Sequence, residues 1–354
     1  MKTYIRCIPL CLMLGAGAAA AQSSSVTIYG VADAGMQFID ADGDGGSHSK
    51  LGVVSGGRNG SRLGLRGNED LGDGLSAIFT LEQGYDFTDG NLGQGGRMWG
   101  RQAFVGLKGG FGTLALGRIA TFSAGSGAFD MFGDVDPFMT SYGISGVGST
   151  LSSASGLRTD NTVVYMSPSW NGWRVGAAHS FNFDGETQFG RHDNLYVTSL
   201  GLQYANGPVT AALTYDSLNN PAGGRDERHY QLGAAYDFEV VKLFAAVGYE
   251  SGQFSPDFNI TGTTNGANAR AWMVGLSAPL GAAGTVRLSY QNRDGERVRG
   301  DERDVSVLSV GYEYNLSKRT MLYAAIADSN GRHTLDDDPD FDRRVYTVGV
   351  AHRF

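Results

Sequence analysis

The residues with the clearest chemical character are three carboxylates in one short segment rich in aromatic side chains. Asp130, Asp134 and Asp136 lie between Phe129 and Phe138, inside a stretch rich in Gly and Ser from about 120 to 158. A connection of that length within a compact domain is usually functional or disordered, and its aromatic residues argue against disorder. We therefore expect this stretch to fold back into a hollow structure and to narrow it.

Other patterns that could support catalysis or metal binding are incomplete. The sequence contains no Gly-x-Ser-x-Gly nucleophile elbow. His179 and Ser180 are adjacent, but neighbours on a strand face opposite sides. The run that begins at Asp40 imitates the start of a calcium loop, yet Leu51 stands where the bidentate glutamate belongs. We predict no catalytic residues, no metal site and no cofactor.

The amino terminus has the features of a secretory signal peptide. Lys2 and Arg6 flank the start of an apolar run, and small residues end at Ala21, so we expect a signal peptide over 1–21 and a single domain over 22–354. Both cysteines lie inside this segment, which leaves the mature chain without thiol chemistry. Removing Lys2 and Arg6 from 28 basic residues leaves 26 against 36 acidic ones, a net charge of −10. That charge disfavours nucleic acid as a partner.

The composition favours many short strands. The chain carries 54 glycines, and an interior glycine costs a helix about 1 kcal/mol relative to alanine. Segments of about ten residues with alternating polarity recur along the chain, separated by turn residues. We predict about sixteen strands, near 26–39, 60–69, 75–86, 98–108, 112–119, 159–167, 172–183, 194–205, 208–217, 227–238, 240–251, 268–278, 284–293, 303–315, 320–329 and 342–354.

The connections between these strands alternate between short and long. Tight turns such as Asn206-Gly207 alternate with longer connections. The long loops are predicted near 40–59, 87–97, 120–158, 184–193, 218–226, 252–267, 294–302 and 330–341. Tight turns at one end and long loops at the other are typical of a bacterial outer-membrane barrel, whereas a soluble sandwich or propeller has no reason to sort its loops in this way. We predict an all-β fold, a transmembrane antiparallel β-barrel.

Alternation within the strands predicts which side chains face the lumen. Leu63 and Leu65 share one parity, and Arg62 and Arg66 share the other. We expect the leucines to face lipid and the arginines to face the lumen. Arg118 shares the parity of its neighbouring leucines, so we expect it at the barrel rim or between subunits.

Several motifs, taken together and in order, resemble the trimeric general porins of Gram-negative outer membranes, most closely the betaproteobacterial branch. The resemblance covers essentially the whole mature chain and implies a sixteen-stranded barrel, a homotrimer, and a third loop folded into the lumen as the constriction. The motifs are Ser25-Val26-Thr27-Ile28-Tyr29-Gly30-Val31-Ala32-Asp33, Ser61-Arg62-Leu63-Gly64-Leu65-Arg66-Gly67-Asn68-Glu69-Asp70-Leu71-Gly72, Arg101-Gln102-Ala103-Phe104-Val105-Gly106-Leu107, Phe111-Gly112-Thr113-Leu114-Ala115-Leu116-Gly117-Arg118, Asn161-Thr162-Val163-Val164-Tyr165-Met166-Ser167-Pro168 and the terminal Phe354.

The resemblance also implies site residues. In such porins an arginine cluster on the barrel wall faces acidic residues on the third loop. The wall positions are Arg62, Arg101 and Arg158, to which strand parity adds Arg66, and the two loop acids are Asp130 and Asp134. The loop departs from the family's Pro-Glu-Phe-Gly-Gly core, because Gly133-Asp134-Val135-Asp136-Pro137 stands in its place. Which of Asp130, Asp134 and Asp136 points into the pore is therefore open.

These residues predict a channel. Arginines on one wall and carboxylates opposite would create a transverse field across a water-filled pore, with no reaction to catalyse. We predict passive diffusion of ions and small hydrophilic solutes across the cell outer membrane, by a protein exported through the periplasm after signal-peptide cleavage. A substrate-specific channel, a non-conducting adhesin and a barrel enzyme are the alternatives. The sign of the ion preference is open, because the chain is acidic and the predicted wall residues are basic.

The expected partners follow from the same features. The outward face of the first strand carries Gly30 and Ala32, and such small residues suit close packing between subunits of a homotrimer. Outer-membrane lipid and lipopolysaccharide are expected around the barrel. Phe354 is similar to the signal that the outer-membrane assembly machinery reads on the C-terminal strand.

Overall fold

The computed structural model describes residues 24–43, 46–138, 157–183, 185, 187–188, 194–220, 225–253, 267–298, 301–331 and 341–354. The predicted signal peptide and residues 139–156 of the third loop lie outside these ranges. Within them, no helix has the length and apolar character needed to cross a membrane.

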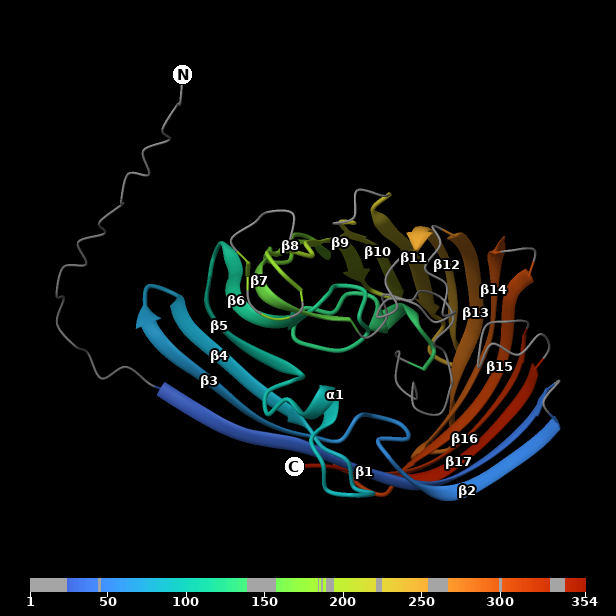
Figure 1. Ribbon diagram of the computed structural model, residues 1–354. Helices are drawn as coiled ribbons and strands as arrows, with labels where there is room; N and C mark the ends of the chain where they lie inside the picture. Colours follow the sequence, from blue (N-terminus) through green and yellow to red (C-terminus); the bar gives the residue numbers. More distant parts are fainter. Residues whose placement is uncertain are drawn as a thin grey trace.

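The described strands form one antiparallel sheet that closes on itself (Figure 1). Consecutive strands pair, except that β2 and β3 both pair with β1. β17 returns to pair with β1 from Val31–Arg353 to Gly43–Phe341. The strands are β1 (Ser24–Gly43), β2 (Gly46–Ser55), β3 (Arg62–Gly72), β4 (Leu75–Gly84), β5 (Gln102–Gly109), β6 (Gly112–Ala120), β7 (Arg158–Met166), β8 (Trp173–Ser180), β9 (Val197–Asn206), β10 (Val209–Leu218), β11 (Glu227–Asp237), β12 (Lys242–Gln253), β13 (Ala267–Leu280), β14 (Gly284–Val298), β15 (Asp301–Asn315), β16 (Thr320–Gly331) and β17 (Phe341–Arg353), with short helical turns α1 (Gly93–Gly96) and η1 (Gly133–Val135).

The first strand explains why these seventeen strands build a sixteen-strand barrel. The second half of β1 pairs with β2, and its first half pairs with β3. β2 and β3 are therefore two parts of one barrel strand, interrupted by residues 56–61. The predicted all-β fold, a closed antiparallel barrel of sixteen strands, is confirmed.

Two predicted loops are wrong. Residues predicted as the loop 40–59 belong largely to the β1–β2 hairpin, which places Asp40 of the calcium-loop imitation opposite Ser49 in a regular ladder. Residues predicted as the loop 294–302 mostly extend β14 and β15. Both segments are polar and rich in Gly, Ser or charged residues. Strands pair through backbone hydrogen bonds, so a segment with polar side chains can continue a strand past the part of the barrel that lipid surrounds.

Burial along the strands is inverted relative to a soluble protein. On β11, Gln231 is 1% exposed, whereas Leu232 is 52% exposed. On β12, Val247 is 53% exposed and the inward-facing carboxylate of Glu250 is 1% exposed. Apolar side chains on the outer face and polar ones inside are the pattern of a barrel that lipid surrounds.

Aromatic side chains gather near both ends of the strands. Tyr230 lies near the long-loop end, with its ring centroid 5.0 Å from that of Tyr215 and 6.2 Å from that of Tyr249. At the short-turn end of the same strand, the rings of Tyr236 and Phe238 are 4.4 Å apart. Two such aromatic girdles mark the two interfaces of a membrane.

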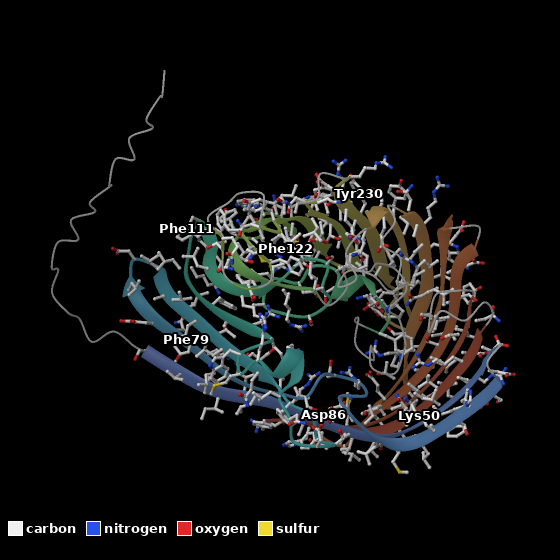
Figure 2. All side chains as sticks on the ribbon, viewed as in Figure 1. Lys50, Phe79, Asp86, Phe111, Phe122 and Tyr230 are labelled. Carbon is white, nitrogen blue, oxygen red and sulfur yellow. The ribbon has the colours of Figure 1, made fainter. Side chains whose placement is uncertain are left out.

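Residues 121–138, which follow β6, pack against the inner face of the wall from β8 to β15 (Figures 1 and 2). Several of these contacts fall on a glycine. A Cβ added at Gly201 would lie 2.5 Å from the sulfur of Met131, and one added at Gly233 would lie 2.5 Å from Val135. The same close approach holds for Gly176 against Phe122, Gly275 against Pro137 and Gly311 against Phe138. That the whole stretch 120–158 narrows the lumen stays a prediction.

Candidate pore-lining site

The interrupted second barrel strand turns residues 56–61 inward. The buried carboxylate of Asp33 accepts hydrogen bonds from the backbone amides of Arg58, at 3.3 Å, and Asn59, at 2.8 Å, and from the hydroxyl of Tyr323, at 2.7 Å. Gly57 allows the close approach, because a Cβ there would lie 2.6 Å from the Tyr323 oxygen. The segment is thereby fixed inside the barrel and presents Arg58 to its interior.

Arg58 joins this segment to another part of the wall, at β14 and β15. Its Nε lies 2.8 Å from Oε1 of Glu313 on β15, and that oxygen lies 3.2 Å from Nε of Arg287 on β14. Arg287 also donates to the carbonyl oxygen of Pro137 at 2.5 Å. One carboxylate thus ties two arginines together, and one of these arginines holds the internal segment.

A second carboxylate organises the predicted wall arginines. Glu82 on β4 places Oε1 2.7 Å from Nε of Arg101 and Oε2 3.7 Å from Nε of Arg62. Tyr29 donates its hydroxyl to Oε2 at 2.9 Å. Glu82 pairs across the ladder with Gly64, which has the same parity as Arg62, so the parity argument that found Arg62 would also have found Glu82.

The other two predicted wall arginines lie close by. The guanidinium of Arg66 stands 5.3 Å from the ring centroid of Tyr29, which is a cation–π distance. Arg158 donates from Nε to the carbonyl oxygen of Arg101 at 3.0 Å and from Nη2 to the hydroxyl of Ser126 at 3.2 Å. The structure therefore brings all four predicted arginines to one side of the barrel interior.

These groups surround a cavity of about 770 Å³. Its charged lining in the described residues consists of Arg58, Arg62, Arg66, Arg101, Arg353, Glu82 and the terminal residue Phe354. The charged side chains of this lining are thus five guanidinium groups and one carboxylate. Arg158 contacts the cluster from behind and does not line this cavity.

The three predicted loop acids divide into two groups. The carboxylate of Asp130 accepts hydrogen bonds from the backbone amides of Gly125, Phe132 and Gly133, at 2.9, 3.2 and 3.0 Å. Asp136 is 4% exposed and accepts from the amide of Phe138 at 2.7 Å. Both carboxylates are therefore used to shape the segment itself.

Asp134 differs from the other two acids because its side chain is exposed. Its Oδ2 lies 3.4 Å from Nε2 of the Gln203 side chain, a long contact. Burial raises the pKa of Asp130 to about 6, an effect larger than the opposing one of its three amide donors. Of the three acids, Asp134 is the one whose side chain is exposed.

Arg118 binds outside this cluster. Its Nη1 lies 2.5 Å from Oδ1 of Asp160, whose Oδ2 lies 2.6 Å from Nη1 of Arg97. Nε of Arg118 donates to the carbonyl oxygen of Gly100 at 2.8 Å. The ion pairs connect β6 and β7 with the 85–101 connection. A role at the rim or between subunits stays a prediction.

The family model described as Gram-negative porin matches residues 10–334. This chain belongs to that family. An outer membrane porin protein of Bordetella pertussis is 38% identical to this porin, over 97% of this chain and 98% of that protein. Outer membrane porin protein 32 of Delftia acidovorans is 34% identical, over 90% and 88%. The solved structure of the anion-selective porin from Comamonas acidovorans superposes with a TM-score of 0.75, at 27% identity, over 94% of this chain and 100% of that one.

These findings confirm three predictions. The protein is a porin of the Gram-negative outer membrane, its fold is the porin barrel, and its function is that of a general porin channel. The predicted residue roles are not decided by the comparisons.

The porin contains a further buried charge cluster that sequence reasoning missed. His229 on β11 places Nε2 3.0 Å from Oε1 of Glu227 and Nδ1 3.1 Å from Oε1 of Glu250, and Glu250 also pairs with Arg293 on β14. All four are at most 1% exposed. Their even spacing along inward-facing strand positions was the signal available in the sequence.

The chain terminus completes the barrel. The backbone of Phe354 exchanges two hydrogen bonds with Gly30, at 3.0 and 3.1 Å, and its ring lies so near Gly30 that an added Cβ would be 2.3 Å away. Phe354 thus extends the pairing between β17 and β1. Recognition of Phe354 by assembly machinery stays a prediction.

Proposed function

We propose that this porin is a homotrimeric general-diffusion channel that favours small anions. The observation that carries the ion preference is the charge of the 770 Å³ cavity, whose lining holds five arginines and one acidic side chain, Glu82. Charged groups that line a constriction bias which ions pass. The engagement of Asp130 and Asp136 by backbone amides supports the same sign, because it leaves Asp134 as the exposed acid of the segment. The name of the anion-selective relative agrees with this preference.

The constriction in this proposal is the passage between the arginine side of the wall and the 121–138 segment. Gly125 and Ser126 of that segment line the same cavity as Arg62 and Arg101, which supports the assignment. A solute crossing here meets guanidinium groups on one side and the small residues Gly125 and Ser126 on the other. The guanidinium groups stabilise small anions, and an apolar solute would have to displace the water that these groups bind.

Reversal potentials in planar lipid bilayers under a tenfold KCl gradient test the ion preference. We expect a reversal potential of the sign that chloride dominance gives, and a shift toward zero when Arg62 and Arg101 are both replaced by Gln. A cation-selective wild-type current would refute the anion preference. Closure of the current in three equal steps supports the trimer, and single independent closures contradict it.

A solute-specific channel is distinguished by the concentration dependence of flux. Diffusion through a general pore rises in proportion to solute concentration, whereas a binding site saturates. Liposome swelling with a series of sugars and organic anions measures this directly. Saturation with a single solute would replace the general-diffusion proposal.

A further inference from the structure

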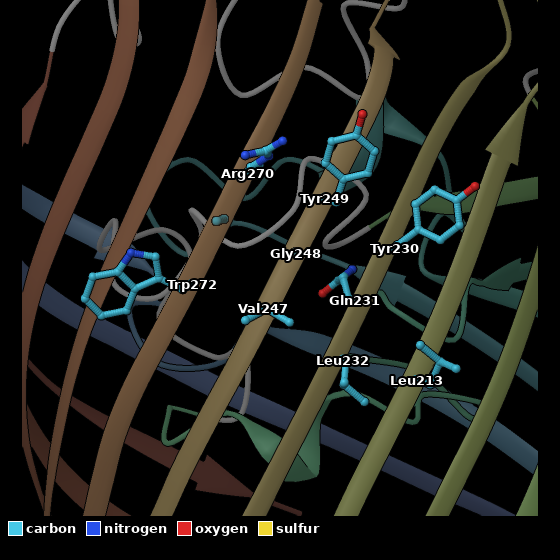
Figure 3. Close-up of a pocket in the computed structure, with 10 residues that line it drawn as sticks. Leu213, Tyr230, Gln231, Leu232, Val247, Gly248, Tyr249, Arg270 and Trp272 are labelled. Carbon is cyan, nitrogen blue, oxygen red and sulfur yellow. The ribbon is translucent and has the colours of Figure 1, made fainter.

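The outer face of β10–β13 carries a depression with one polar end and one apolar end (Figure 3). Its volume is about 480 Å³. Leu213, Leu232, Val247 and Trp272 form the apolar end, and each is between 43% and 53% exposed. Tyr230, Tyr249 and Arg270 form the other end. Because these side chains point away from the barrel, lipid and not the channel has access to them.

Arg270 is the unusual residue of this surface. It pairs across the ladder with Tyr249 and stands two residues from Trp272, both exposed on the apolar face. Within the described part of the chain it has neither an ion pair nor a hydrogen bond. An arginine on the lipid face of a barrel costs up to about 2–4 kcal/mol at the bilayer midplane and about 0–1 near an interface. An anionic group of a membrane lipid would lower this cost by pairing with the guanidinium.

Other arginines of the outer face have a protein partner. Nε of Arg344 on β17 lies 3.3 Å from Asp328 on β16. Arg228 on β11 has Asp226 at 3.9 Å, with both side chains about half exposed. Arg270 differs from both, so its charge is not explained by the barrel's own ion pairs.

The depression lies in the outer half of the membrane. β12 and β13 are joined by the long connection 254–266, and Tyr249 and Arg270 are the lining residues nearest to it. Long connections are extracellular in bacterial barrels. The polar end therefore faces the headgroups of the outer leaflet, and the apolar end lies along its acyl chains.

A second cation stands at a suitable distance. Arg228 on β11 lies opposite Ser251, which is two residues beyond Tyr249 on β12, and β11 is two strands from Arg270 on β13. Two strand spacings across and two residues along place the two Cα atoms about 12 Å apart. Arg228 is only weakly held by Asp226, since such exposed pairs contribute about 0–1 kcal/mol. Two arginines at this separation match a head group that carries two phosphates.

We propose that this depression binds the bisphosphorylated glycolipid of the outer leaflet, the lipid A part of lipopolysaccharide. One phosphate pairs with Arg270 and the other reaches Arg228. An acyl chain lies along Leu232 and Val247, and the Tyr230 and Tyr249 hydroxyls bind at the level of the sugars. Guanidinium groups suit this role, because they bind phosphate through two parallel hydrogen bonds.

Native mass spectrometry of the porin, purified from outer membranes and delipidated in detergent, tests the site by titration with bisphosphorylated lipid A. We expect Arg270→Gln to weaken binding at least tenfold and Arg270→Lys to weaken it less. Arg344→Gln is the matched control, because this arginine is also on the outer face but has Asp328, and we expect a change below twofold. Heat-modifiable gel mobility and unchanged channel conductance show that each variant is folded.

Three results would overturn the proposal. They are equal binding by wild type and Arg270→Gln, an equal loss in Arg344→Gln, and equal affinity of the wild type for phosphatidylglycerol and for lipid A. The last result would make the depression a general lipid contact. Monophosphorylated lipid A should bind several-fold more weakly than the bisphosphorylated form, and equal binding would remove Arg228 from the site.

Discussion

Replacing Asp130 with Asn removes the charge of this residue and keeps two of its three hydrogen bonds. Oδ1 accepts from the amides of Gly125 and Phe132, and Oδ2 accepts from the amide of Gly133. The single oxygen of an Asn amide can replace Oδ1 but not Oδ2. We expect Asp130→Asn to keep the path of the 121–138 segment through the two bonds at Oδ1. What it removes is a carboxyl group that titrates in the folded protein near pH 6.

The expected change in unfolding free energy with pH follows from the pKa of Asp130. Burial raises the pKa of Asp130 from 3.8 to about 6, roughly two pH units, and each unit corresponds to 1.36 kcal/mol. The raised pKa means that the folded protein binds this proton more tightly than the unfolded chain does. Its stabilising contribution is thus fully present below about pH 4 and is lost as the pH rises through about 6. Relative to Asp130→Asn, the wild type should lose about 2.5 kcal/mol of unfolding free energy between pH 4 and pH 7.

Equilibrium unfolding in urea, followed by tryptophan fluorescence at pH 4 to 8, measures this difference. Hydrogen exchange of peptides covering 121–138 reports it as well if the segment opens before the barrel. Asp134→Asn is the control variant, because it removes a carboxyl group from an exposed position of the same segment. Identical pH profiles for wild type and Asp130→Asn would refute the reasoning.

Three further perturbations test the pore. Asp134→Asn should move the reversal potential toward anions, and an unchanged potential would show that Asp134 lies outside the conduction path. Glu82→Gln removes the negative charge that pairs with Arg101 and Arg62, so we expect a stronger anion preference and an unfolding free energy lower by roughly 3 kcal/mol; an unchanged reversal potential would show that Glu82 lies outside the conduction path. Gly233→Val should displace the internal segment and enlarge the conductance steps, whereas Ala234→Val on the outward face of the same strand should not; equal steps in both would count against the segment as constriction.

The period of a strand made much of the fold predictable from sequence. A repeat of two residues separates lipid-facing from lumen-facing positions, and it assigned Arg62 and Arg66 to the inner face, where the structure has them. The same repeat could not show where a strand ends once it extends past the lipid and both of its faces are polar. The β1–β2 hairpin is held by backbone pairing that its polar composition hides, and it was predicted as a loop for that reason.

The partners of the site residues were harder to predict from the sequence. Arg58 and Glu313 are 255 positions apart. Which side chains meet inside a closed barrel depends on the pairing register of the strands, and local sequence patterns do not set that register. The engagement of Asp130 was readable in principle, because an Asp followed three residues later by Gly is common in turns. The resemblance to porins placed Asp130 among the loop acids and left open which of them faces the pore.

The row of glycines beneath the 121–138 segment has a consequence for the order of folding. The segment contacts strands far ahead of it in the chain, as in the bond between Pro137 and Arg287, 150 positions apart. The glycines that it contacts on β8, β11, β13 and β15 come together only after those strands have paired. Docking of the segment must therefore follow closure of the sheet. Contacts of such long sequence separation form slowly. A newly inserted barrel should therefore conduct first through a wide lumen and narrow afterwards, in a late phase that time-resolved current recordings can detect.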